Sequence, residues 1–429
     1  MTAIAERNTI ENNSSIGAFP NVNDQSQAGL SVADAVVKML ENLGVKYAFG
    51  ILGGAITPIV AQLERSTIKV LHFRHEGGAA FAAIEAYFAS GNPVAVFTTN
   101  GPGITNAITG MLAARWEGAK VIFVSPSTSA AQRGRWAFQE TSAYTMPISG
   151  LFTSGSLFHY AASLETGAEL PEVARRLAQG VAQSGGFVAH VSVPTAVQSS
   201  LNSVALSRST FSQAAFGTDN NTIAKCAELL SAGRFGIWVG FGARFAAAEI
   251  RQLAEKTGAA VMCSPRGKGI FPEDHPQFVG VTGFGGHQSV LNYMQEFCPQ
   301  RLLVLGTRLC EFTSFWSPAM VPPGGFVHVD IDPSVPGTAY PDAETFSVPS
   351  DVGIFVKALT KLMPELPIEA LPHPELQKIE PNTFGPVRPD VLMAAIQRVI
   401  VEGSDAVVIS EAGNSFAWAT HHLQFAKPS

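Results

Sequence analysis

The stretch LHFRHEGGAAFAAIEAYFASG (Leu71–Gly91) decides the fold of this chain, together with PVAVFTTNGPGITNAITGM (Pro93–Met111) directly behind it. An apolar strand delivers one carboxylate, Glu76, to the start of an Ala-rich helix. A second strand then ends in a Gly-Pro-Gly turn that opens another helix. This alternation predicts a parallel α/β sheet with helices on both faces.

Glu76 occupies a position that is unfavourable for a charge unless the chain uses it. Its sequence neighbours are apolar, and burying an unpaired carboxylate costs free energy. One interpretation is an ordinary helix N-terminal glutamate, stabilised by the helix dipole. The Gly-Pro-Gly turn nearby favours a functional carboxylate instead, because ligands of open α/β sheets bind at the carboxyl ends of the strands.

The composition restricts both the class of protein and its partners. With 429 residues the chain is long enough for two or three domains. Hydrophobic residues make up 46% and charged residues 14%, which suits buried parallel sheets and a large subunit interface. No run of about 18 apolar residues occurs and the formal charge is -6, so we expect neither a membrane span nor a nucleic-acid partner. Four widely spaced cysteines predict reduced thiols in a cytoplasmic protein.

Shifts in composition divide the chain into domains and linkers. In chain order we predict a disordered arm (1–29), a first domain (30–197), a polar linker (198–221), a second domain (222–364), a Pro-rich linker (365–388) and the beginning of a third domain (389–429). The predicted fold class is therefore α/β, with consecutive parallel-sheet three-layer domains. The third domain offers only a helical pattern and the strand DAVVISEAG (Asp405–Gly413), so we expect it to be incomplete in this chain.

Apolar runs rich in β-branched and aromatic residues predict the strands. They are IKVLHFRH, PVAVFTTN, AKVIFVSP and GFVAHVSVP in the first domain, and RFGIWVGFG, AAVMCSP, RLLVLGTRL and GFVHVDIDP in the second. A helix is predicted from the N-cap residue Ser31 to Gly44, and others at 222–230 and within PDVLMAAIQRVIVEG.

Three further motifs give weak signals. VGFGARF (Val239–Phe245) has two glycines but not the third of a dinucleotide fingerprint. HVDIDP (His328–Pro333) ends a strand with two acidic residues, which are more simply solvated loop carboxylates than ribose ligands. His421 and His422 are adjacent, so on a helix they point in different directions and make a poor metal pair.

Several motifs, in order, resemble thiamine-diphosphate-dependent enzymes of the acetolactate (acetohydroxyacid) synthase type. They are FGILGGAITPI, FRHEGGAAFAAIEAYFASG, TTNGPGITNAITG, WAFQET (Trp136–Thr141), RGKGIFPEDHP and VHVDIDP. The resemblance implies that 30–197 is a pyrimidine-binding domain, that 222–364 is a central nucleotide-binding-like domain, and that 389–429 begins a diphosphate-binding domain.

The resemblance also implies roles for individual residues. Glu76 is then the catalytic carboxylate, which shares a proton with the aminopyrimidine ring and shifts its tautomer before the cofactor attacks a 2-oxo acid. The implied cofactor-binding residues are Gly53, Gly54, Pro102, Asn106, Gly413, Asn414 and Ser415. Phe138 and Gln139 are implied to line the substrate channel. Implied ligands are thiamine diphosphate with Mg2+ and, in some members, FAD; implied partners are a homodimer or tetramer, or a complementary C-terminal chain.

The chain departs from the family pattern at four places. Leu52 replaces a common proline, and Phe158 stands where such synthases tend to carry lysine. LGTRLCEFT (Leu305–Thr313) lacks the acidic-acidic-Arg run associated with FAD, and no Gly-Asp-Gly metal motif occurs. We therefore keep two alternatives: a carboligase for bulkier or aromatic 2-oxo acids, and a non-catalytic binding or assembly subunit. A plain NAD-binding protein is a more distant third.

Overall fold

The protein was described from a computed structural model, which covers residues 30–142, 145–146, 149–202, 204, 216–375, 379 and 384–426. The chain forms two compact units, Met1–Ser212 and Gln213–Ser429, and each is described by itself. The predicted arm (1–29), half of the predicted linker 198–221 and part of the linker 365–388 lie outside the described residues.

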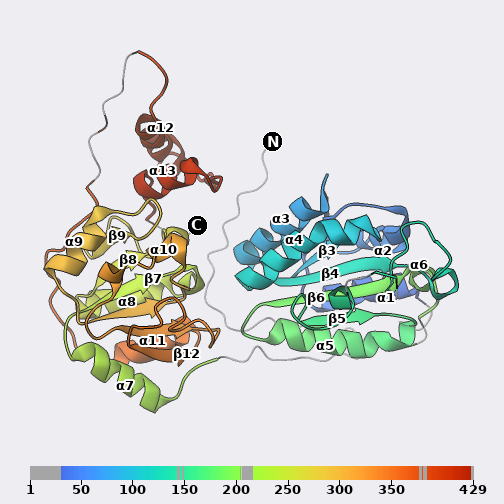
Figure 1. Ribbon diagram of the computed structural model, residues 1–429, viewed down its shortest axis with the longest axis horizontal. Coiled ribbons are helices and arrows are strands. Elements are labelled where there is room, and N and C mark those ends of the chain that lie inside the picture. Colours follow the sequence, from blue (N-terminus) through green and yellow to red (C-terminus); the bar gives the residue numbers. More distant parts are fainter. Residues whose placement is uncertain are drawn as a thin grey trace. The chain divides into compact units, whose positions relative to one another are not determined.

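The first unit contains a six-stranded, fully parallel sheet in the order β2-β1-β3-β4-β6-β5 (Figure 1). Its strands are β1 (Tyr47–Gly50), β2 (Lys69–His72), β3 (Val94–Phe97), β4 (Lys120–Ser127), β5 (Tyr160–Ser163) and β6 (Phe187–Pro194). Every residue of β3, β4 and β6 is buried, because helices cover both faces of the sheet. The α/β prediction is confirmed.

Helices pack on both faces of this first sheet. They are α1 (Val32–Asn42), α2 (Thr57–Leu63), α3 (Glu76–Ser90), α4 (Pro102–Glu117), α5 (Leu170–Ala182) and the short α6 (Thr195–Gln198). The side chains of α1, α2 and α5 share one core, while α3 and α4 lie together on the other face (Figure 1). Ser31 caps α1 as predicted, and it forms a capping box with Asp34, which was not predicted. Glycine at 110 lets α3 and α4 approach closely, since a Cβ there would lie 2.3 Å from the Cβ of Ala80.

The second unit contains another six-stranded parallel sheet, in the order β12-β11-β10-β7-β8-β9. Its strands are β7 (Phe235–Val239), β8 (Ala260–Cys263), β9 (Phe278–Val281), β10 (Arg301–Leu305), β11 (Phe326–Asp330) and β12 (Thr345–Pro349). Its helices are α7 (Asn220–Ser231), α8 (Ala247–Thr257), α9 (Gln288–Glu296), α10 (Glu311–Ser314) and α11 (Val352–Leu362). The strand order reverses between β7 and β10, which is where doubly wound sheets bind ligands.

The C-terminal residues form helices without a sheet. Helix α12 (Pro389–Ile396) continues into a π-helical turn, η8 (Gln397–Val401), and α13 (Asn414–His422) packs on α12. The strand predicted at Asp405–Gly413 is wrong, because no strand is present there and Val407 and Ile409 are 78% and 89% exposed. A strand needs a neighbour to pair its backbone N–H and C=O groups, and the described residues provide none at this position.

Single-turn elements complete the description. The 3-10 turns are η1 (Gly54–Ile56), η2 (Ala130–Gln132), η3 (Ser149–Leu151), η4 (Gly167–Glu169), η5 (Phe241–Ala243), η6 (Pro265–Gly267) and η7 (Pro318–Met320). In the described part of the chain, none of the helices has the length and apolar character needed to cross a membrane.

Candidate functional site

Glu76 is the first residue of α3, and only 8% of its surface is exposed. His75 provides the N-cap, since its Nδ1 accepts a hydrogen bond from the backbone N–H of Gly77 at 3.1 Å. The carboxylate therefore sits at the positive end of the dipole of a 15-residue helix.

One oxygen of Glu76 is held by α4 and the other faces a glycine. The side-chain amide of Asn106 donates to Glu76 Oε2 at 3.1 Å. Oε1 lies 3.5 Å from the place where a Cβ of Gly103 would stand. Among the residues that the structure describes, none donates a hydrogen bond to Oε1. This oxygen is thus the one that a bound ring could reach.

Glycines let the two loops beside Glu76 pack closely on the side chain of Thr99. A Cβ at Gly53 would lie 2.5 Å from the Cβ of Thr99, and one at Gly103 would lie 2.9 Å from the Cγ2 of Thr99. The loops after β1 and β3 therefore meet through backbone at the carboxyl ends of two paired strands. Gly54 faces open space, and Pro102 is exposed at the first position of α4.

The predicted substrate-channel residues lie on a loop that is tied to the Gly-Pro-Gly turn. The amide of Asn100 donates to the carbonyl of Gln139 at 3.0 Å, and the hydroxyl of Thr141 donates to the same carbonyl at 2.9 Å. In turn, the backbone N–H of Gly101 donates to Thr141 Oγ1 at 2.7 Å. The side chain of Phe138 is 87% exposed. Asn100 and Thr141 were not predicted as site residues, although both lie within motifs quoted above.

The backbone of this loop is strained, which makes its anchors important. Gln139 and Trp136 have φ values of 51° and 61°, the left-handed region that non-glycine residues rarely adopt. The carboxylate of Glu140 accepts from the backbone N–H groups of Gly134 and Ala137 at 2.5 and 3.2 Å. Trp136 is displayed with 97% of its surface exposed.

We expect Thr141→Val to loosen this loop, because it removes the hydroxyl that joins Gly101 to Gln139. Leaving the partly buried N–H of Gly101 without its partner costs about 1 kcal/mol, so trypsin should cleave after the exposed Arg135 about fivefold to tenfold faster. The control Thr141→Ser keeps the hydroxyl and should be cleaved at the wild-type rate. Equal cleavage rates for both variants would contradict this role of the hydroxyl.

The remaining predicted cofactor residues lie in the second unit, at the start of α13. The carboxylate of Glu411 accepts from the backbone N–H of Gly413 at 3.0 Å and from the hydroxyl of Ser415 at 3.3 Å. Asn414 is the first residue of the helix. Two donors therefore converge on one anionic group at a helix N-terminus, an arrangement that suits a phosphate equally well.

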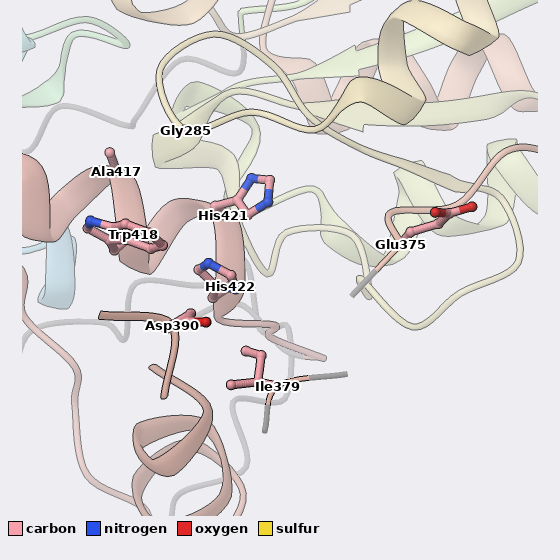
Figure 2. Close-up of a pocket in the computed structure, with 8 residues that line it drawn as sticks. All are labelled: Gly285, Glu375, Ile379, Asp390, Ala417, Trp418, His421 and His422. Carbon is pink, nitrogen blue, oxygen red and sulfur yellow. The ribbon is translucent and has the colours of Figure 1, made fainter. Parts of the chain in front are cut away.

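A cavity of about 470 Å³ lies beside α13 (Figure 2). Its lining residues are Gly285, Glu375, Ile379, Asp390, Ala417, Trp418, His421 and His422. The rings of Trp418 and His422 stack at 5.3 Å with an angle of 10°. In the described ranges, no group of three His, Cys, Asp or Glu side chains is arranged to hold a metal ion.

The sheet of the second unit is called the central sheet below. At the carboxyl ends of its strands, arginine side chains stack on aromatic rings. The guanidinium groups of Arg244 and Arg266 lie 4.5 and 4.3 Å from the centre of the Phe241 ring, just after β7. At the end of β11, burial raises the pKa of the Asp330 carboxyl, so this residue is less solvated than its motif predicted.

Comparisons with known proteins place both units in one enzyme family. Residues 30–146 match the family model "Thiamine pyrophosphate enzyme, N-terminal TPP binding domain", and residues 223–359 match "Thiamine pyrophosphate enzyme, central domain". A solved structure of a putative thiamin diphosphate-dependent enzyme from Mycobacterium smegmatis superposes with a TM-score of 0.77 at 18% identity, over 93% of this chain and 75% of that one. Benzoylformate decarboxylase from Polynucleobacter necessarius gives the same TM-score and identity, over 93% and 73%. At that identity these two structures show the fold.

Curated relatives carry the name acetolactate synthase. The enzyme from Mycobacterium bovis is 28% identical over 93% of this chain and 66% of its own length. The large subunit of isozyme 1 from Escherichia coli is 30% identical over 70% of this chain and 52% of its own length. The chain thus spans just under two thirds of the first relative and about half of the second. The chain belongs to the thiamine pyrophosphate enzyme family, of which it carries the N-terminal cofactor-binding domain and the central domain.

Proposed function

We propose that this chain activates thiamine diphosphate in a carboligase or decarboxylase of the acetolactate synthase type that acts on 2-oxo acids. The observation that carries the proposal is the Glu76 carboxylate, with Oε2 held by Asn106 and Oε1 facing Gly103. Relatives named acetolactate synthase support the reaction type. A second candidate, a carboligase for bulkier or aromatic 2-oxo acids, is favoured by the exposed Trp136 and Phe138 on the loop of Gln139.

The residues around Glu76 fit the aminopyrimidine ring of the cofactor. Oε1 accepts from no donor among the described residues, and Gly103 presents no side chain to it, so this oxygen suits a nitrogen of the ring. When bound, thiamine diphosphate supplies the nucleophilic carbon and the electron sink for loss of CO2. With the cofactor bound, Glu76 Oε1 would exchange a proton with a ring nitrogen. Asn106 keeps the carboxylate oriented, and the helix N-terminus stabilises its charge after the proton is given up.

We propose that Gly413, Asn414 and Ser415 bind the diphosphate, accompanied by Mg2+. The two donors that now meet the Glu411 carboxylate would then turn to phosphate oxygens. Glu411→Gln should therefore bind Mg2+-pyrophosphate about threefold to tenfold more tightly, because a charge that repels the ligand is removed. Isothermal titration measures this, with the exposed Glu402→Gln as control. Weaker binding by Glu411→Gln would contradict the competition.

We propose that the complete site forms in a homodimer or tetramer, or with a complementary C-terminal chain. The outer faces of α3 and α4 expose Phe81, Leu112 and Trp116, large apolar side chains that an interface would cover. Analytical ultracentrifugation tests this face by comparing the oligomeric state of Trp116→Glu with that of Trp136→Glu. Trp136→Glu is the control, because it also replaces one exposed tryptophan but lies outside this face. Loss of association only in Trp116→Glu supports it.

FAD is a further candidate ligand, at the edge of the central sheet between β7 and β10. The reversal of strand order and the nearby Arg244 and Arg266 support a nucleotide there. The glycine pattern after β7 lacks a third glycine, and Leu305–Thr313 lacks the acidic-acidic-Arg run. Flavin absorbance of the purified protein, and its loss in Arg244→Ala, decides this point.

Turnover assays test the proposed function as a whole. The chain is incubated with thiamine diphosphate, Mg2+ and either pyruvate, 2-oxobutyrate or phenylpyruvate, and CO2 release is measured. Release from the first two supports the acetolactate synthase type, and release only from phenylpyruvate supports the second candidate. No release from any of them, alone or with the C-terminal third of the Mycobacterium bovis relative, favours a non-catalytic binding or assembly subunit.

A further inference from the structure

Helix α13 lies against the loop that follows β9, through direct contact at Gly285. This glycine has a φ of +73°, and a Cβ there would lie 2.6 Å from the carbonyl oxygen of Ala417 and 3.0 Å from the Cβ of Thr420. Figure 2 shows the loop of Gly285 beside the helix that carries Ala417 and His421. Only glycine satisfies both the backbone conformation and the close approach.

His287 joins the same loop to the last turn of α13. Its Nδ1 accepts from the backbone N–H of Val281 at 3.0 Å, and its Nε2 donates to the carbonyl of His421 at 2.8 Å. Burial lowers the pKa of His287 to about 4, so the ring is neutral at pH 7 and carries one proton. Because Nδ1 accepts the hydrogen bond from Val281, the proton of the neutral ring lies on Nε2. Nε2 can therefore donate to the carbonyl of His421.

A second loop holds the segment that follows α13. The backbone N–H of Glu273 donates to the carbonyl of Phe425 at 3.2 Å. The carboxylate of Glu273 is buried and pairs with the ammonium of Lys268 at 2.7 Å, while the N–H of Gly269 donates to its other oxygen at 3.1 Å. These bonds hold the loop Lys268–Glu273 in one conformation, and the loop in turn holds the backbone of Phe425.

The contact reaches the first turn of α13 as well. The ring of Phe284 stacks on Phe416 at 6.3 Å and meets Phe312 edge-on at 5.2 Å. Phe416 directly follows Ser415. The helix is thus attached near its start, along its middle and beyond its end.

We propose that the loops Lys268–Glu273 and Gly283–His287 form a seat for α13, and that Gly285 and His287 are positioning residues for the diphosphate donors at Gly413–Ser415. The inference rests on the proposed function, in which these donors bind the diphosphate. Its physical basis is preorganisation: donors on a helix that is already fixed lose less freedom when they bind an anion. Gly413 N and Ser415 Oγ already converge on one carboxylate, and the seat would hold the helix that presents them.

Hydrogen exchange of the full chain tests the seat. Gly285→Ala must displace α13, so exchange in the peptides spanning 414–425 should rise at least about tenfold, which corresponds to about 1.4 kcal/mol. Gly337→Ala is the matched control, since Gly337 has a φ of +82° in the same unit and its nearest neighbour would lie at 3.9 Å. Unchanged exchange in Gly285→Ala, or an equal rise in Gly337→Ala, overturns the seat.

Binding of inorganic pyrophosphate with Mg2+, and of thiamine diphosphate, tests the positioning role. His287→Ala should weaken both about tenfold, and His287→Gln, which keeps a donor near the Nε2 position, should restore them. Equal binding by wild type and both variants overturns the positioning role alone. If the wild-type chain binds neither ligand, the proposed role of Gly413–Ser415 is wrong and the positioning role falls with it, while hydrogen exchange still decides the seat.

Discussion

Glu76→Gln is expected to lower kcat for 2-oxo acids by roughly 10²- to 10⁴-fold, the usual contribution of a general acid–base group. Glutamine has nearly the same shape, and its oxygen can still accept from the Asn106 amide, so the fold should remain intact. It cannot give and take the proton that Oε1 would share with a ring nitrogen under the proposed function. The effect should therefore appear in kcat rather than in the stability of the first unit.

The matched control for this change is Glu85→Gln on the same helix. Glu85 is exposed, so its replacement should leave both kcat and stability unchanged. Steady-state rates for both variants, and urea unfolding of each, separate a chemical effect from a structural one. Near-normal turnover by Glu76→Gln would contradict the role of this carboxylate in activating the cofactor.

The strands that could be predicted from sequence are those whose residue types by themselves indicate a buried strand. Runs such as AKVIFVSP and GFVAHVSVP contain the β-branched residues that buried parallel strands favour, and they form β4 and β6. Four strands were missed, namely β1, β5, β9 and β12. Sequences such as YAFG and YAAS are short and have no β-branched residue, so only their pairing with neighbours makes them strands.

The wrong strand at Asp405–Gly413 shows the same principle in reverse. Its AVVIS core has every local feature of a buried strand, yet these residues form no strand. Local preference is weak compared with the free energy of pairing and burial. A sequence pattern therefore predicts a strand only where the fold also provides a neighbouring strand.

The candidate site could be predicted only in part. Features that depend on neighbouring residues in the sequence could be predicted, whereas contacts between distant segments could not. The place of Glu76 at the start of a helix follows from the strand-to-helix junction around it. Its bond to Asn106 depends on α3 and α4 approaching closely at Gly110, which no local pattern reports. The same holds for Thr141 and Gly101, which are 40 residues apart in the chain.

Phe158 illustrates how a sequence comparison and a structure can differ. It was singled out because relatives tend to carry lysine at this place, which directed attention to the substrate. In the structure its side chain is fully buried and lies 5.1 Å, ring to ring, from His190. Phe158 therefore contributes to the core around His190, and exposed residues such as Phe138 are better candidates for contact with substrate.

His190 should make the first unit less stable in acid by about 2 kcal/mol between pH 7 and pH 5. Its ring is fully buried and stacks on Phe123 at 4.8 Å. Since a carbonyl can only accept, Nδ1 donates to Leu151, and Nε2 accepts from the hydroxyl of Ser125 at 2.7 Å. Burial lowers the pKa of His190 from 6.5 to about 4. Between these two values the unfolded chain binds the proton and the folded chain does not, so stability falls as the pH falls.

The comparison of wild type with His190→Phe isolates this contribution. At pH 7 the variant should be less stable by about 1–3 kcal/mol, because Ser125 and Leu151 lose their partner. At pH 5 the wild type has lost the contribution of its neutral histidine, so the difference should shrink by about 2 kcal/mol. Urea unfolding at both pH values gives this difference, in which all other titrating groups cancel. A difference that is the same at both pH values would mean that His190 keeps an ordinary pKa in the folded protein, and that water reaches a ring which the structure shows to be enclosed.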